Sequence, residues 1–270
     1  YEIHERLVGS EMCIRDRTRK EIYMIKAFTY MFKDNRFIQK SSIYFLFLLI
    51  GTFCTNYANI LLKAGGKPVL HLVYLAGIIL LLVPYGYVVS CIKALTEQKE
   101  NFILPMFNVK TNFVIGLKYI IAILLLSLIF GFITVAAAFM IGLICGILKA
   151  KVLAIVLLSL VITSAVLLLI FYTLALNWIF ANTQAITSFL QFKRAHALIS
   201  QDYPRYWKGV GLAFGLNFVL GILLIFVLGL AGKNIVSIFF ATLMSTFLTS
   251  YIVFVNAMIN AKSISPDCRI

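Results

Sequence analysis

The chain has 270 residues, of which 62% are apolar and 13% are charged, and its mean hydropathy is +0.99. Soluble domains contain about 45–50% apolar and about 25% charged residues, so this composition excludes a soluble globular protein. It predicts an integral membrane protein. The formal net charge of +14 rests on few residues, so their positions along the chain indicate its orientation in the membrane.

The start of the chain differs from the rest because it is polar and has no hydrophobic periodicity. Residues 1–17 read as the translation of a transposon-based sequencing adapter, and a genuine polar leader is the alternative. Residues 18–23 are compatible with the codons of a ribosome-binding site before Met24. We therefore interpret residues 1–17 as adapter read-through and 18–23 as an untranslated leader. One polytopic membrane domain is expected over residues 24–270.

The apolar runs after Met24 are long enough to cross a bilayer, which takes about 20 helical residues. The run 113–148 would extend about 54 Å as one helix and would need tilt, a break or an extension. A seventh helix would need a turn near Gly131 or Gly142, but no polar turn occurs there. The sequence therefore predicts an all-α integral membrane protein with about six transmembrane helices in three helical hairpins, plus interfacial amphipathic helices. The expected spans are residues 43–62, 69–93, 113–148, 152–180, 209–231 and 235–260.

Lysine and arginine are distributed unequally between the two ends of these expected spans. After Met24, fourteen of them lie on the side of the two termini and five on the other side, and all five acidic residues lie on the richer side. Positive residues in short loops are retained in the cytoplasm. We therefore expect both termini in the cytoplasm and the protein in the cytoplasmic (inner) membrane. The ribosome-binding-site interpretation implies a bacterium or archaeon.

Two segments on the expected cytoplasmic side combine basic residues with apolar residues at helical spacing. These are residues 24–40 and 182–201, and the second runs into Tyr203, Tyr206 and Trp207. The pattern is typical of amphipathic helices in the interface, and the aromatic rings suit the headgroup zone. We expect a basic rim that contacts anionic lipid of the inner leaflet. Its members are Lys33, Arg36, Lys193, Arg194, Arg205 and Lys208.

The polar residues within the spans are mainly amides and hydroxyls. No Asp, Glu, Lys or Arg lies in the middle of a span, which counts against a proton-coupled transporter. The amides either line a polar path or form hydrogen bonds between helices, and we prefer the second interpretation. The candidates are Asn56, Asn59, Asn177, Asn217 and Asn256.

Small residues and one proline suggest how the helices pack. Gly142 and Gly146, like Gly211 and Gly215, are four residues apart, which predicts close helix contact within the chain or, as the alternative, in a homodimer. Pro84 predicts a kink in the second span. No cluster of His, Cys or carboxylate residues suits catalysis or metal binding, so we expect no enzymatic activity, cofactor or metal site. No nucleic-acid partner is expected either.

Several short motifs occur in a characteristic order. They are Phe32-Lys-Asp34, Pro84-Tyr-Gly-Tyr87, Leu104-Pro-Met-Phe107 and Gly116-Leu-Lys118. In this respect the chain resembles the prokaryotic membrane family catalogued as domain of unknown function 4013, over about residues 24–260. It departs from the family pattern after Phe107, where a more acidic or Trp-containing segment is expected. The resemblance implies a multi-helix bacterial or archaeal inner-membrane protein and no established activity, catalytic residue or ligand.

The sequence therefore supports two alternative hypotheses about function. The first is a non-enzymatic membrane protein whose basic rim binds anionic lipid and scaffolds other membrane components. The alternative is a small transporter or channel for an apolar or zwitterionic solute. A cavity that brings together Asn56, Asn177 and Asn217 would favour the alternative, whereas a dry helix bundle would favour the rim.

Overall fold

The computed structural model describes residues 34, 36–97, 103–229 and 235–264. These residues form seven α-helices and one 3-10 helix, and they contain no strand. Six of the helices are long and apolar enough to cross a membrane, which confirms the predicted fold class. They are α2 (Phe37–Lys63), α3 (Leu70–Glu97), α4 (Val109–Ile147), α5 (Lys151–Thr183), α7 (Tyr203–Gly229) and α8 (Ile235–Ser263); the 3-10 helix η2 (Ile186–Leu190) and α6 (Phe192–Gln201) lie between α5 and α7.

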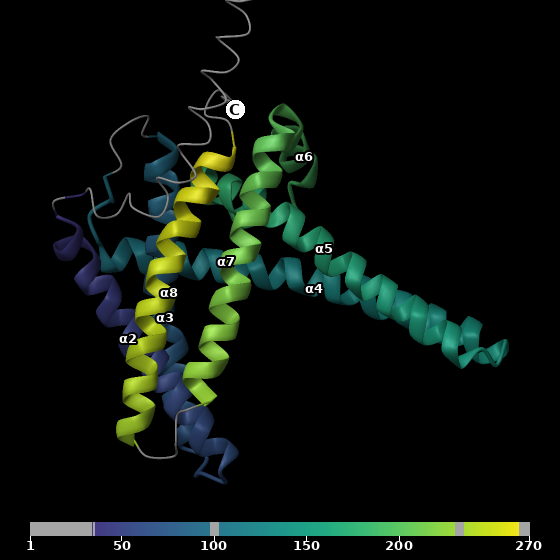
Figure 1. The fold of residues 1–270 in the computed structure, drawn as a ribbon, viewed down its shortest axis with the longest axis horizontal. Coiled ribbons are helices and arrows are strands. Elements are labelled where there is room, and N and C mark those ends of the chain that lie inside the picture. Colours follow the sequence, from purple (N-terminus) through teal and green to yellow (C-terminus); the bar gives the residue numbers. More distant parts are fainter. Residues whose placement is uncertain (1–33, 35, 98–102, 230–234, 265–270) are drawn as a thin grey trace, which may run out of the picture.

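Successive long helices pack as hairpins, α2 on α3, α4 on α5 and α7 on α8. Helix α3 is central because it also contacts α4 and α8. In Figure 1, α2, α3, α7 and α8 run side by side, and the α4–α5 hairpin crosses them and projects well beyond them. The projecting part exposes apolar side chains such as Val152 and Ile155, which suits lipid rather than water as solvent.

The third predicted span is one unbroken helix of 39 residues, α4. No turn occurs at Gly131 or Gly142, and at 1.5 Å per residue the helix is about 58 Å long. Figure 1 shows α4 running steeply across the four other helices rather than along them. Its first turn is capped by Asn108, whose side chain accepts a hydrogen bond from the Thr111 N–H at 3.0 Å.

Glycine allows α3 and α4 to approach until their backbones touch. A methyl group built at Gly86 would overlap the carbonyl oxygen of Asn112, and one built at Gly116 would overlap that of Leu82. In contrast, no atom lies within 4 Å of a methyl group built at any of the four glycines that the sequence predicted as packing positions. Among the described residues, these positions therefore make no close helix contact within the chain, and the packing assigned to them stays a prediction. These positions are Gly142, Gly146, Gly211 and Gly215.

The two predicted amphipathic segments have different outcomes. Residues 24–33 lie outside the described residues, and residues 37–40 are the start of α2. The second segment is not one helix, because α5 continues to Thr183 and ends at Gln184, whose φ of 51° is left-handed. The chain then forms η2 and α6, and α6 packs on α5 and α7. Its apolar face is therefore covered by protein.

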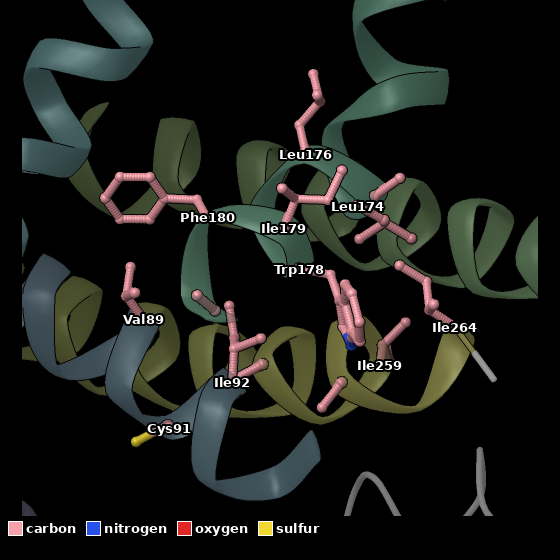
Figure 2. Packing of buried hydrophobic residues seen from close by; sticks show 14 of the residues in the cluster. Val89, Cys91, Ile92, Leu174, Leu176, Trp178, Ile179, Phe180, Ile259 and Ile264 are labelled. Atoms are coloured by element: carbon pink, nitrogen blue, oxygen red, sulfur yellow. The ribbon is translucent and has the colours of Figure 1, made fainter. Parts of the chain in front are cut away.

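The main core lies where α3, α5 and α8 meet the beginnings of α4 and α7. Figure 2 shows Trp178 of α5 pointing toward Ile259 of α8, with Ile92 of α3 nearby. Tyr44 of α2 extends this core through ring contacts with Tyr87 of α3 at 5.6 Å and with Phe254 of α8. The main core thus lies toward one end of the bundle.

Candidate functional site

A cavity of about 380 Å³ lies beside this core, between α3, α4, α5, α7 and α8. Most of its wall is apolar, with Val89 of α3 and Ala213 of α7 among its members. Four asparagines supply most of its polar groups, and we call it the asparagine-lined cavity. They are Asn177 of α5, Asn217 of α7, and Asn256 and Asn260 of α8.

The cavity lies toward the end of the bundle at which α3 and α8 end and α4 and α7 begin. Val89 is in the last third of α3, Tyr119 in the first third of α4, and Asn260 close to the end of α8. The sequence prediction assigns this end to the cytoplasmic side. The cavity therefore belongs to the same half of the membrane domain as the basic residues.

A chain of hydrogen bonds connects α7 to α8 at the cavity. The Asn217 side-chain nitrogen donates to the Ala213 carbonyl oxygen at 2.7 Å. The Asn256 side-chain nitrogen donates in turn to Asn217 Oδ1 at 3.2 Å. Because a backbone carbonyl only accepts, the first bond orients the Asn217 amide, and the second then orients the Asn256 amide. Asn256 Oδ1 is left as the free end of the chain.

Two amide oxygens at the cavity are buried without a hydrogen-bond partner among the described residues, Oδ1 of Asn256 and Oδ1 of Asn260. The two residues are one helical turn apart on α8, so their side chains share one face. Asn260 is only 3% exposed. A buried acceptor without a donor costs about 1–3 kcal/mol. Both oxygens are covered by neighbouring atoms, so they are unsatisfied acceptors beside the cavity rather than on its open surface.

Tyr119 of α4 and Asn177 of α5 form the adjoining side of the cavity. The Tyr119 hydroxyl donates to Asn177 Oδ1 at 3.1 Å. The ring of Tyr119 lies 6.5 Å from that of Tyr85 and 5.4 Å from that of Phe180. These contacts hold the phenol in place, so the Tyr119 hydroxyl and Asn177 Oδ1 are paired with each other.

The other in-span candidates lie elsewhere. Asn56 of α2 donates to the Thr242 hydroxyl of α8 at 3.4 Å, which is an interhelical hydrogen bond away from the cavity. Asn59 is exposed on α2. Pro84 is buried within α3, which continues through it. Asn260 was missed because it is the last residue of its predicted span, although its spacing of four from Asn256 places both on one helix face.

The described residues of the basic rim lie at the same end of the molecule as the cavity. Arg36 precedes α2, Lys193 and Arg194 lie in the first turn of α6, and Arg205 and Lys208 lie near the start of α7. Arg36, Lys193 and Lys208 are exposed, whereas Arg194 and Arg205 are half-buried. Lys33 lies outside the described residues.

The aromatic residues beside the basic rim differ in their exposure. Tyr203 and Trp207 are exposed at the start of α7, with their rings 6.1 Å apart. Tyr206 is instead buried, because its hydroxyl donates to the Phe171 carbonyl of α5. Tyr206 therefore ties α7 to α5, and only its two neighbours are available to headgroups.

An ion pair joins the start of α2 to the segment before α4. Lys40 Nζ lies 2.8 Å from Asp34 Oδ2 and also donates to the Leu104 carbonyl oxygen at 2.8 Å. The Leu104 N–H donates to the same carboxylate at 3.0 Å, and the Arg36 N–H donates to its other oxygen. Burial alone would raise the pKa of Asp34, but these hydrogen bonds together hold it below its ordinary value.

A family model described as "Protein of unknown function (DUF4013)" matches residues 69–229, from the last residue before α3 to the end of α7. The chain belongs to this family. No curated protein and no solved structure matches the chain. Asn177 and Asn217 lie within the region matched by the DUF4013 family, and Asn256 and Asn260 lie beyond it.

The residues that carry the resemblance to the DUF4013 family lie together in the fold. Asp34 is bonded to Leu104, and the Tyr87 hydroxyl donates to the Pro105 carbonyl oxygen at 3.0 Å. Gly86, beside Tyr87, is in contact with the turn of α4 that contains Gly116. These motifs therefore hold α2, α3 and α4 together, and Tyr85 is the one of their described residues that lines the cavity.

Proposed function

We propose that this protein is a non-enzymatic membrane protein that binds a small solute in the asparagine-lined cavity and passes it across the bilayer. In this proposal the protein lies in the cytoplasmic membrane of a bacterium or archaeon with both termini in the cytoplasm, so the cavity lies in the cytoplasmic half. The observation that carries the proposal is the convergence of Asn177, Asn217 and Asn256 from three helices on one cavity.

The character of the wall supports this proposal over a dry bundle. Small-molecule sites are mostly apolar cavities of about 300–1,000 Å³ with a few polar groups that fix orientation. The asparagine-lined cavity has this size and this combination of groups. Hydrogen bonding between helices explains the Asn217–Asn256 contact, but it leaves Oδ1 of Asn256 and of Asn260 without a donor among the described residues.

A side chain that fills the cavity tests the proposal. Ala213 and Ala257 line the cavity from α7 and α8, so Ala213→Phe or Ala257→Phe places a ring in its space. The exposed Ala136 of α4, changed to Phe, is the matched control. Native mass spectrometry should detect a small-molecule adduct on the wild type and the control, and none on the two filled variants. Equal adducts on all four proteins would refute the proposed site.

The basic rim supports a second role, contact with anionic lipid headgroups. Its described cations gather at one end of the bundle, beside the exposed rings of Tyr203 and Trp207. Aromatic residues at the interface and lysines or arginines near anionic lipid both favour such contact. We include this role in the proposal as the way the protein is held in the inner leaflet, and scaffolding of other membrane components would use the same surface.

A further inference from the structure

We infer that the asparagine-lined cavity opens sideways into the bilayer and that its occupant is an acyl chain of a membrane phospholipid. The chain enters past exposed residues of α3, α5 and α7, while the headgroup stays at the basic rim. This inference rests on the proposed function, because it names the class of solute that the same cavity takes and the route by which that solute enters.

The opening of the cavity is marked by those of its lining residues that are exposed. Two of them, Tyr85 and Asn217, lie near the midpoints of α3, which has 28 residues, and of α7, which has 27. The middle of a helix that crosses about 30 Å of hydrocarbon lies among lipid chains rather than in water. The opening therefore faces the interior of the bilayer. Its residues are Tyr85 of α3, Thr173 of α5, and Phe214 and Asn217 of α7.

The end of the cavity nearest the start of α7 is closed by the main core. Ile92 of α3, Val210 of α7 and Asn260 of α8 line the cavity at this end. On each helix, a residue three or four positions nearer that end belongs to the main core and is at most 2% exposed. A solute in the water on that side is therefore separated from the cavity by packed side chains, whereas a molecule in the bilayer meets the opening. The three closing residues are Leu95, Tyr206 and Ile264.

The polar groups of Thr173 and Asn217 at the opening are compatible with a hydrocarbon chain. The Thr173 hydroxyl donates to the Leu169 carbonyl oxygen of its own helix. The Asn217 amide donates to the Ala213 carbonyl oxygen and accepts from Asn256. Because these groups are bonded within the protein, a chain without polar atoms leaves neither residue with a lost hydrogen bond.

The wall behind the opening suits the chain and not the headgroup. Most of it is apolar, and among the described residues that line the cavity none is an Asp, Glu, Lys, Arg or His. A phosphate without a counter-charge is strongly disfavoured in such surroundings. Apolar cavities instead exclude water and bind apolar molecules. Of the two solutes considered from the sequence, these properties favour the apolar one over the zwitterionic one.

The basic rim supplies the charge that an anionic headgroup needs. Lys208 precedes the cavity residue Val210 by two positions on α7, which is about 3 Å along the helix axis. Trp207 is exposed on the same face of α7 as Phe214, seven residues further on at the opening. Lysine and tryptophan at the interface favour contact with anionic lipid. A phosphatidylglycerol molecule therefore meets the rim with its headgroup and the opening with one chain.

Photochemical labelling from within the bilayer tests this inference on the full chain. The protein is placed in nanodiscs that contain phosphatidylglycerol with a photoreactive diazirine at the middle of one acyl chain, and the adducts are mapped by peptide mass spectrometry. The readout is the labelling of three half-buried cavity residues relative to that of Ile155, which is exposed on α5 and does not line the cavity. The three residues are Val88 of α3, Ile170 of α5 and Val253 of α8.

Two variants change the cavity, and each has a matched control. Ala213→Phe fills the cavity, and Ala136→Phe is its control. Thr173→Trp narrows the opening from an exposed position, so it leaves the core intact even if Ala213→Phe does not fold. Thr163→Trp is the same substitution at an exposed position of α5 that does not line the cavity.

We expect the wild type and both controls to carry the label at the three cavity residues. Ala213→Phe and Thr173→Trp should each lower the labelling ratio roughly tenfold, the equivalent of about 1.4 kcal/mol of binding, because the added ring takes the space of the chain. Labelling of Ile155 should be the same in all five proteins, since any lipid around the protein reaches it.

Other outcomes overturn the inference in distinguishable ways. Equal ratios in all five proteins, or no labelling of the cavity residues in the wild type, would show that the cavity does not hold an acyl chain. If only Ala213→Phe lowers the ratio, the assigned opening is wrong. The proposed function is judged separately, by the small-molecule adduct in native mass spectrometry. If Ala213→Phe removes that adduct without changing the labelling, the inference alone fails; if it changes neither, both fail.

Discussion

The carboxylate of Asp34 connects the start of α2 with the segment that precedes α4. Its two oxygens accept hydrogen bonds from the side chain of Lys40 and from the N–H groups of Arg36 and Leu104. The side chains of Lys40 and Asp34 are only 7% and 6% exposed. Removing one partner of such a pair leaves the other buried without compensation, which is strongly destabilising.

We predict that Asp34→Asn lowers the free energy of unfolding by about 2 kcal/mol at neutral pH. Because the pKa of Asp34 is below its ordinary value of 3.8, its contribution is present above that value and is lost as the pH falls through the lower, folded-state pKa. The difference in thermal midpoint between wild type and variant should therefore shrink below about pH 4. Thermal unfolding followed from pH 7 to pH 3 measures it.

Glu97→Gln is the control for this prediction, since Glu97 is exposed at the end of α3 and should change the midpoint little at any pH. An Asp34→Asn variant as stable as the wild type at pH 7 would contradict the role assigned to this carboxylate.

At the residue scale the sequence indicated which side chains are unusual but not which ones meet. Asn177, Asn217 and Asn256 could be chosen because each is an amide within an apolar run. Their convergence depends on how α5, α7 and α8 cross, and these helices are apolar on most faces, so periodicity does not fix their rotation. The same ambiguity made Asn56, which bonds to Thr242, look like part of the site.

At the scale of helices, the glycines also show that the sequence does not indicate which residues of two helices meet. Gly86 and Gly116 lie at the contact of α3 and α4, and Gly51 and Gly77 bring α2 close to α3. The spacing of four that singled out Gly142 and Gly146 describes one helix only. Whether a glycine is needed depends on the neighbouring helix, and the sequence of one helix does not contain that information. Helix ends were predicted within four residues, because charged and polar residues mark them, except at the starts of α2 and α7, which lie six residues before the predicted starts.

Alanine substitution should change the stability of the protein in opposite directions at these two classes of glycine. Gly86→Ala places a methyl group against the Asn112 backbone and should destabilise the protein by about 1–3 kcal/mol through overpacking. Gly142→Ala meets no atom within 4 Å, so it should be neutral or stabilise by up to about 1 kcal/mol through helix propensity. Thermal unfolding in one detergent compares them. Equal losses for both variants would contradict the close contact of α3 and α4.

At the scale of the whole molecule, composition and charge were sufficient for the fold class but not for the arrangement. Six spans follow from run length, and hairpins follow from short connections. The steep inclination of the α4–α5 hairpin does not, because a helix that is apolar all round fits lipid at many angles (Figure 1). Where this hairpin crosses the other helices, the main core is formed at one end of the bundle. The cavity and the described residues of the basic rim lie at that end.

The last prediction concerns this end of the molecule. Changing the six residues of the basic rim to Gln should reduce the number of phosphatidylglycerol molecules that remain bound to the purified protein in native mass spectrometry. Each lysine or arginine near an anionic surface contributes about 1 kcal/mol, so the sextuple variant should lose most of its preference for phosphatidylglycerol over phosphatidylcholine. High salt should reduce the preference of the wild type in the same direction.

The matched control changes to Gln the five lysines that the sequence assigns to the other side of the membrane, which alters the net charge by a similar amount without changing the basic rim. They are Lys63, Lys67, Lys149, Lys151 and Lys233. If net charge alone attracted anionic lipid, both variants would lose the preference. If the rim is the contact surface, only the sextuple variant loses it, because electrostatic attraction falls off within about 8–10 Å at physiological salt and a hydrocarbon core of about 30 Å separates the two predicted sides.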